Sequence, residues 1–198
     1  MRDNRIRAAV AQLVERKLPK LEVAGSRPVR RLRSRALNLP ASDNVTAVSE
    51  HTIARAETAD LADLLVLMRA YCDFYEVAPT DEDLLALARA LIADPEGEAM
   101  QFIAREDTGR ASGFATLFWT WSTTNACRIG IMNDLYVAEP ARGHGLADRL
   151  IETCRAQCAR RGARRLTWQT APDNHRAQAV YDRVGGNREQ WVDYWLAS

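Results

Sequence analysis

With 198 residues, 47% of them hydrophobic, the chain is long enough to bury a sizeable core in one domain with an appended segment. No apolar run approaches membrane-spanning length and the N-terminus lacks the apolar core of a secretory signal, so we expect a cytoplasmic protein rather than a membrane or secreted one. The net charge is +1, but residues 1–50 carry eleven Lys and Arg against five Asp and Glu, which predicts a basic extension on a mildly acidic body.

Residues 1–50 are expected to precede the folded domain rather than to belong to it. Apolar residues at helical spacing predict a helix over 5–18, which Pro19 ends. The stretch 25–40 has two prolines, five arginines and little periodicity, as in a linker or arm. Its arginines either contact nucleic acid or a membrane surface or are simply solvated. We favour solvation and expect no nucleic-acid contact.

From residue 51 onward, strand and helix patterns follow one another regularly. In chain order they predict a strand over 51–56, helices over 61–72 and 79–94, strands over 99–107 and 111–121, a strand over 127–137, a helix over 145–162, a strand over 164–170, a helix over 174–186 and a last strand over 189–197. A turn at Asp107–Gly109 joins the early strands, and helices cross between the late ones. This order predicts one α/β domain over 51–198, with a mixed, mostly antiparallel sheet flanked by helices.

The four cysteines predict neither a disulfide framework nor a metal site. Cys154 and Cys158 are one helical turn apart, and no histidine stands at ligand spacing nearby. We therefore interpret them as small core residues and expect no metal.

The stretch from Asn133 to Ile151 passes from a strand to a helix through Arg142 and two nearby glycines. Glycines let a backbone approach a ligand closely, and the unpaired amides of a first helical turn attract anions, so this turn predicts a phosphate site. The Gly-Lys-Ser/Thr of a P-loop is missing, and Asp148 stands where a dinucleotide fingerprint needs its third glycine. The pattern Arg/Gln-x-x-Gly-x-Gly/Ala is fully met by Arg142, Gly145 and Ala147.

Over residues 53–198 the chain resembles the GNAT superfamily of acyl-CoA-dependent N-acyltransferases, and this turn carries the resemblance. The resemblance implies that backbone groups of Leu135 and Val137 pair with the pantetheine arm of acetyl-CoA. It also implies that the turn holds the coenzyme A pyrophosphate with Arg142, Gly143, His144, Gly145, Leu146 and Ala147. His144 would then be a rim residue near phosphate and not a base.

A second family motif lies in the helix predicted over 174–186. Asn174, Ala177, Val180 and Tyr181 match the pattern Asn-x-x-Ala-x-x-Leu/Val-Tyr, while Gly186 stands where phenylalanine is commonest. The resemblance assigns Asn174 and Ala177 to the cofactor and places the Tyr181 phenol where it would protonate the departing thiolate. The alternative is that Tyr181 simply packs against the sheet.

The residues on the acceptor side match the family less closely. Several members carry glutamate where this chain has Asn133, so the base is either the neighbouring Asp134 or another group, and a structural role for Asp134 is equally open. The segment before the turn also looks like that of diamine and polyamine acetyltransferases. Trp119 and Trp121 share one face of their strand and either wall an acceptor pocket or pack between layers. An acidic segment containing Tyr75, Glu76, Asp81 and Glu82 is a further candidate for the acceptor mouth.

The combined interpretation is acetyl transfer from acetyl-CoA to the primary amine of a small molecule (a polyamine, a diamine or an amino-acid-like acceptor) by direct attack in a ternary complex. The alternative function is a non-catalytic module that binds coenzyme A, or nothing, and acts through its basic arm on nucleic acid or a protein. Because members of the family commonly dimerise, the aromatic last strand with Trp191 and Trp195 lies either at a homodimer interface or in the core.

Overall fold

A computed structural model describes residues 51–93, 97, 99–192 and 194–197 of the chain. The helix expected over 5–18 and the arm expected over 25–40 lie outside the described residues. Everything below therefore concerns the domain that follows them.

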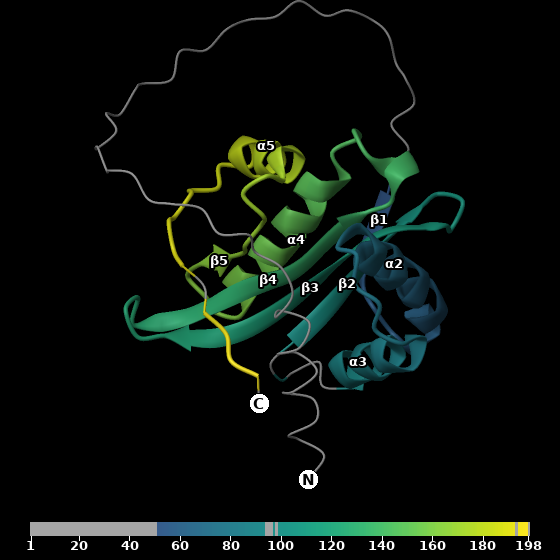
Figure 1. Cartoon of the computed structure of the whole chain (residues 1–198), viewed down its shortest axis with the longest axis horizontal. Helices are drawn as coiled ribbons and strands as arrows, with labels where there is room; N and C mark the ends of the chain where they lie inside the picture. Colours follow the sequence, from purple (N-terminus) through teal and green to yellow (C-terminus); the bar gives the residue numbers. More distant parts are fainter. Residues whose placement is uncertain (1–50, 94–96, 98, 193, 198) are drawn as a thin grey trace, which may run out of the picture.

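Five strands form one sheet whose order in space follows the chain (Figure 1). They are β1 (His51–Arg55), β2 (Ala99–Glu106), β3 (Ala111–Ser122), β4 (Cys127–Val137) and β5 (Leu166–Thr167). The first four pair antiparallel, and β5 runs parallel to β4, so the sheet is mixed and mostly antiparallel, as expected. A parallel neighbour requires a crossover, which the helix between β4 and β5 supplies.

The helices cover both faces of this sheet. α2 (Leu61–Phe74) and α3 (Asp81–Ala93) pack on one face, whereas α4 (Leu146–Arg160) packs on the other and α5 (His175–Arg183) lies beyond it (Figure 1). α3 begins at Asp81, two residues after the predicted start. Thr80 Oγ1 accepts a hydrogen bond from the Asp83 amide at 3.1 Å, and three acidic residues follow in the first turn. Two short 3₁₀ turns, Thr58–Asp60 and Glu139–Ala141, lead into α2 and toward α4.

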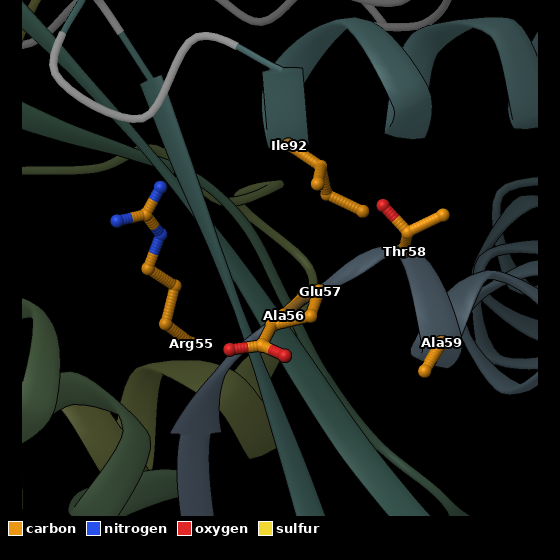
Figure 2. A pocket seen from close by; sticks show the side chains of 6 residues that line it. All are labelled: Arg55, Ala56, Glu57, Thr58, Ala59 and Ile92. Atoms are coloured by element: carbon orange, nitrogen blue, oxygen red, sulfur yellow. The ribbon is translucent and has the colours of Figure 1, made fainter.

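The connection from β1 to α2 is fixed by charge. Arg105 on β2 pairs with Asp60 at 2.6 Å and with Asp63 at 2.7 Å, which ties the start of α2 to the sheet. Beside this connection lies a hollow of about 440 Å³, shown in Figure 2, between residues 55–59 and Ile92 at the end of α3.

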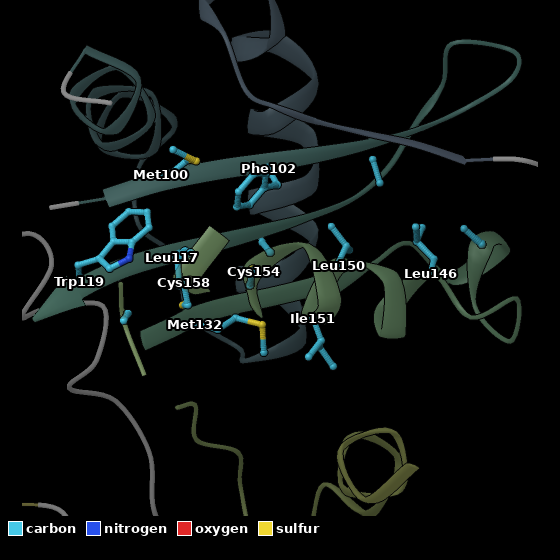
Figure 3. Close-up of a cluster of buried hydrophobic side chains, with 14 residues drawn as sticks. Met100, Phe102, Leu117, Trp119, Met132, Leu146, Leu150, Ile151, Cys154 and Cys158 are labelled. Carbon is cyan, nitrogen blue, oxygen red and sulfur yellow. The ribbon is translucent and has the colours of Figure 1, made fainter. Parts of the chain in front are cut away.

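Two apolar clusters, one on each face of the sheet, form the core. The cluster under α4, shown in Figure 3, includes Leu117 and Met132 from the sheet and Leu150 and Cys154 from the helix. The other cluster joins α2 and α3 to Ile103 and Phe114. A fully buried leucine contributes about 1.5–3 kcal/mol, so these clusters account for much of the stability of the fold.

All four cysteines are buried free thiols, which agrees with their interpretation as core residues. Cys154 and Cys158 face the sheet from α4, and burial raises the pKa of Cys154 to about 12. A thiol with so high a pKa is a poor metal ligand and a poor nucleophile at neutral pH.

The strand predicted over 189–197 is wrong for the residues that the structure describes. Residues 187–192 and 194–197 have no strand assignment, and Trp191 and Trp195 are 80% and 63% exposed rather than core residues. The alternating apolar pattern is real, but a strand also needs a neighbouring edge to pair with. The strand predicted over 164–170 likewise shortens to the two residues of β5.

Candidate active site

The turn between β4 and α4 has the backbone of an anion cradle. Gly143 and Gly145 have φ angles of +87° and +76°, in the left-handed region that favours glycine. Gly145 is the N-cap of α4 and offers no side chain to the helix, so the first-turn amides are left for an external acceptor. The helix dipole places partial positive charge at the same point. The turn from Arg142 to Ala147, the proposed phosphate seat, therefore has the backbone geometry that anion binding requires.

The adjoining end of β4 has an open edge. β5 pairs with Gly130 and Ile131, and the Arg164 amide donates to the Arg128 carbonyl at 3.0 Å, so within the described chain the open part of this edge is residues 132–137. The Ala138 amide donates to Ser112 on β3 at 2.8 Å, so the carbonyl of Val137, in the same peptide unit, points away from β3. By alternation the backbone groups of Leu135 point the same way. An extended amide-bearing chain would find hydrogen-bonding partners along this edge.

Arg142 connects the edge to the turn. Its Nε donates to the Val137 carbonyl at 2.8 Å, and its guanidinium lies over the Tyr136 ring at 5.8 Å from the centroid. One of the outward backbone groups of β4 is thus already used by the protein itself. The outward amide of Val137 and the groups of Leu135 remain for a ligand.

A cavity of about 710 Å³ brings these features together. Its walls come from the end of α2, the open edge of β4, the turn, the start of α4 and α5. Ten of the predicted site residues line it: Leu135, Val137, Arg142, Gly143, Gly145, Leu146, Ala147, Asn174, Ala177 and Tyr181. His144 is exposed in the turn and does not line the cavity. The size and the mixed lining are typical of a small-molecule site.

The charge of the lining suits an anionic ligand. Three arginines line the cavity, Arg142, Arg176 and Arg183, against one carboxylate, Asp148. Asp148 is bound by Arg183 through two hydrogen bonds of 2.7 and 2.9 Å, which hold the pKa of that carboxyl below its usual value. The excess of positive charge beside the glycine turn fits the phosphates of coenzyme A.

The second motif folds as predicted and contributes Tyr181 to the cavity. Asn174 caps α5, since its Oδ1 accepts a hydrogen bond from the Ala177 amide at 3.1 Å. This residue therefore stabilises the start of the helix as well as lining the cavity. The Tyr181 ring packs edge-on against Trp168 with centroids 5.3 Å apart. Burial and the nearby Tyr75 raise the pKa of Tyr181 to about 12, so the phenol keeps its proton at neutral pH.

The wall opposite Tyr181 is aromatic, and sequence reasoning largely missed it. Tyr71, Phe74 and Tyr75, from the last turn of α2 and the residue that follows it, line the cavity. The rings of Tyr71 and Tyr75 stand one helical turn apart with centroids at 4.9 Å. Tyr75 had been considered for the acceptor mouth, but Glu76, Asp81 and Glu82 do not line the cavity. The available signal was this i, i+4 tyrosine pair at the end of an amphipathic helix.

Asp134 lies behind this wall and is almost completely buried, with 7% of its surface exposed. The pairing of β3 with β4 shifts register at this point, so Asn133 is an extra residue between Met132 and Asp134. Period-two alternation predicted opposite faces for Asn133 and Asp134. Instead Asn133 Nδ2 donates to Asp134 Oδ1 at 3.0 Å, because the bulge interrupts the alternation.

The two predicted acceptor tryptophans lie elsewhere. Trp119 is buried in the core cluster of Figure 3, where the guanidinium carbon of Arg161 stands 4.1 Å from its ring centroid. Trp121 is 76% exposed. They pair with Gly130 and Arg128 at the far end of β4 from the cavity, and neither they nor Asn133 line it.

Within the described part of the chain, no group of three or more His, Cys, Asp or Glu side chains has the arrangement of a metal site. None of the described helices is long and apolar enough to cross a membrane. The hollow in Figure 2 has neither a glycine turn nor aromatic side chains in its lining. The cavity between the turn and α2 is therefore the candidate active site.

Comparisons with known proteins point to the same chemistry. A family model described as the acetyltransferase (GNAT) family matches residues 64–186. The Bacillus subtilis (strain 168) protein named uncharacterized N-acetyltransferase YhfO is 33% identical over 145 residues, which cover 73% of this chain and 95% of the relative. The D-amino-acid N-acetyltransferase HPA3 of Saccharomyces cerevisiae is 37% identical over 78 residues, 39% of this chain and 48% of the relative.

A solved structure shows the shared fold. The aminoglycoside N-acetyltransferase AAC(6')-Iy in complex with CoA has a TM-score of 0.66 at 22% identity, and the match covers 78% of this chain and 99% of that protein.

Proposed function

Because the chain belongs to the GNAT acetyltransferase family and is an N-acetyltransferase that uses acetyl-CoA, we propose that it acetylates the primary amine of a small molecule by direct attack in a ternary complex. One observation carries the proposal. The phosphate seat, the open edge of β4 and the Tyr181 phenol all face a single cavity, whose remaining wall is free to bind an acceptor.

The donor half of the cavity fits acetyl-CoA. The amides at the start of α4 and the arginines around them would bind the pyrophosphate, and the outward groups of Leu135 and Val137 would pair with the pantetheine arm. The thioester supplies an activated acetyl group. With the donor bound in this way, its reactive end would extend past Val137 toward α2 and Tyr181.

Tyr181 is proposed to act as the general acid. As the amine forms a bond to the acetyl carbon and the carbon–sulfur bond breaks, the Tyr181 hydroxyl would donate its proton to the departing sulfur. The phenolate would recover a proton from the nitrogen of the new amide. The raised pKa of Tyr181 suits this role, since the residue enters each cycle protonated.

The acceptor half favours a monoamine, amino-acid-like acceptors among them, over a polyamine. Its wall is made of Tyr71, Phe74 and Tyr75, and the one carboxylate in the cavity lining is bound by Arg183 beside the phosphate seat. A polyamine would need further anions to bind its other ammonium groups. The name of the yeast relative, a D-amino-acid N-acetyltransferase, supports including amino acids among the candidates.

A thiol-release assay with acetyl-CoA and a panel of amines tests this proposal. The panel contains D- and L-amino acids, simple monoamines, diamines, polyamines and aminoglycosides. We expect turnover with at least one small amine and a higher kcat/KM for monoamines than for polyamines. Tyr181→Phe should lower kcat by about 100-fold while the acetyl-CoA Kd measured by calorimetry stays within twofold.

Two results would contradict the proposal in different ways. Wild-type turnover by Tyr181→Phe would show that Tyr181 is not the general acid, without contradicting the rest of the proposal. Acetyl-CoA binding with no turnover of any amine would favour the non-catalytic alternative. In that case, DNA binding that weakens with salt and disappears on deletion of residues 1–50 would assign the function to the basic arm.

A further inference from the structure

We propose that Tyr71 is a catalytic residue that carries the proton of the attacking ammonium to Asp134, so that Tyr71 and Asp134 together form the base of the reaction. This inference rests on the proposed function, because it supplies the step that the function requires and that Tyr181 does not perform. A primary amine is an ammonium ion at neutral pH and must lose one proton before its nitrogen can attack a thioester.

The first argument is the environment of Asp134. Its carboxylate is buried against β3, α2 and its own strand, and within the described chain no cation pairs with it. A buried carboxylate that has no cation partner is costly, and such groups occur preferentially at functional sites. Burial raises the pKa of Asp134 above its usual range, although hydrogen bonds from Thr116, Asn133 and Tyr71 oppose this shift. A carboxylate with a raised pKa is a better proton acceptor near neutral pH.

The second argument is that Tyr71 alone among these three partners reaches the cavity. Thr116 accepts a hydrogen bond from Gln101 at 3.2 Å in the core, and Asn133 does not line the cavity. The Tyr71 ring packs against Phe114 and Tyr136, which lie two residues from Thr116 and Asp134 along their paired strands. This places Tyr71 beside Asp134, in keeping with its part in opposing the raised pKa of that carboxyl, and Tyr71 also lines the cavity. A proton that travels from a bound amine to Asp134 through these partners must therefore pass through the Tyr71 hydroxyl.

The third argument is the position of Tyr71 relative to Tyr181. The rings of Tyr71 and Tyr75 have centroids 4.9 Å apart, and Tyr75 also contributes to the raised pKa of Tyr181. All three tyrosines line one cavity. An amine bound at this point would have Tyr71 available to take its proton and Tyr181 available to protonate the sulfur.

The proton transfer balances without any further reactant. The ammonium gives one proton to the Tyr71 oxygen as Tyr71 gives its own proton to the Asp134 carboxylate, so a neutral amine and a protonated Asp134 result. The Tyr71 phenolate does not accumulate, in keeping with a pKa that burial and the neighbouring Asp134 carboxylate raise above its usual value. After acetyl transfer, Asp134 returns its proton to solvent by the same route.

The ionisable groups around this pair come from three elements. α2 contributes Tyr71, Cys72 and the adjoining Tyr75, β4 contributes Tyr136, and α5 contributes Tyr181. Burial raises the pKa values of Tyr71, Cys72 and Tyr181 above their usual range, so these three groups are neutral at pH 7. Asp134 is thus the group in this set that changes charge in the acidic limb of a pH–rate profile.

The test compares Tyr71→Phe, Asp134→Asn and the double variant with the wild type in the full chain. For the best amine of the panel, kcat/KM is measured from pH 6 to pH 10, with the acetyl-CoA Kd and the Tm of each variant as checks on folding. Phenylalanine keeps the ring contacts of Tyr71 with Phe114 and Tyr136 and removes only the hydroxyl. Tyr136→Phe is the matched control for the pH profile, because it removes a hydroxyl from a neighbouring ring that has no hydrogen bond to Asp134.

We expect Tyr71→Phe to lower kcat/KM at pH 7 by about 100-fold, with a loss that shrinks as the pH rises toward the pKa of the free amine. Asp134→Asn should show a similar loss, and the double variant should be within about threefold of either single variant, because both act in one relay. Tyr136→Phe should keep the wild-type shape of the profile.

A wild-type pH profile in Tyr71→Phe, or losses that multiply in the double variant, would overturn the relay and leave the acetyltransferase function intact. A wild-type protein that acetylates no amine would overturn the proposed function and the relay with it. If Asp134→Asn fails to fold, the pH profile of Tyr71→Phe alone decides.

Discussion

The two halves of the cavity are built from different materials. The donor half is mostly backbone: the glycine turn, the first amides of α4 and the open edge of β4. The acceptor half is made of side chains from the end of α2 and from α5. Backbone amides present the same groups whatever the side chains are, whereas an aromatic wall changes chemically with every substitution.

This difference explains why the donor half indicates the family, whereas the acceptor half is specific to the individual enzyme. The phosphate and pantetheine parts of the donor are the same in any acyl-CoA reaction, so a backbone cradle serves them all. Acceptors vary, and their recognition depends on the few side chains that face them. The proposed pair of Tyr71 and Asp134 belongs to the half that is free to vary.

Two glycines with the same backbone conformation test the donor half. Gly145 and Gly109 have φ angles of +76° and +82°, and a Cβ on either would meet no atom within 4 Å. Alanine at each should therefore cost a similar strain of about 1–2 kcal/mol. Gly145→Ala should also weaken acetyl-CoA binding about tenfold by calorimetry, because a loss of about 1.4 kcal/mol in binding free energy raises the Kd by a factor of ten. Gly109→Ala, in the hairpin turn, should leave that Kd unchanged; equal Kd values for the two variants would mean that the turn is not the seat.

The pH dependence of stability tests the burial on which the acceptor half depends. The folded-state pKa of Asp134 is raised above its unfolded value by burial, so ionisation opposes folding. The penalty is absent below the unfolded pKa, near 3.8, and grows as the pH rises from there through the folded pKa. Asp134→Asn should thus gain a few degrees of Tm on the wild type between pH 4 and pH 8. A Tm difference that does not change with pH would mean that Asp134 is not ionised by pH 8 or not buried.

The smallest effect of a substitution is expected at Trp121, which lies outside the acceptor half of the cavity. The side chain is 76% exposed and lies away from the cavity lining. Trp121→Ala should leave both the Tm and the KM for the amine unchanged within error, as surface substitutions usually do. A tenfold rise in that KM would restore the acceptor role that the sequence suggested for this residue.

The sequence was most informative where function follows from local chain geometry. The strand, turn and helix between Asn133 and Ile151 are contiguous, and a left-handed glycine turn before an amphipathic helix builds an amide cradle wherever it occurs. The cap of α5 at Asn174 is equally local, since its partner Ala177 is three residues away. The fold class and the local geometry of this turn could therefore be predicted in advance.

Other predictions depended on contacts that a linear pattern does not contain. The apolar alternation over 189–197 resembles a strand, but the described residues there have no strand partner in the sheet and Trp191 is exposed. Trp119 and Trp121 share a strand, yet one is sealed in the core by α4 and Arg161 while the other faces solvent. Pairing and burial are properties of the neighbours, and the neighbours come from distant positions.

The sequence by itself determined that this chain is a mixed α/β domain with a glycine turn before a helix and a tyrosine at the matching place of a later helix. Only the tertiary structure decided what lies across the cavity from that tyrosine. One extra residue in β4 brings the side chains of Asn133 and Asp134 together, and the packing of α2 on the sheet brings Tyr71 to the cavity. The physical reason is that an amide cradle needs only consecutive residues, whereas the proposed relay needs residues of α2 and β4 to meet.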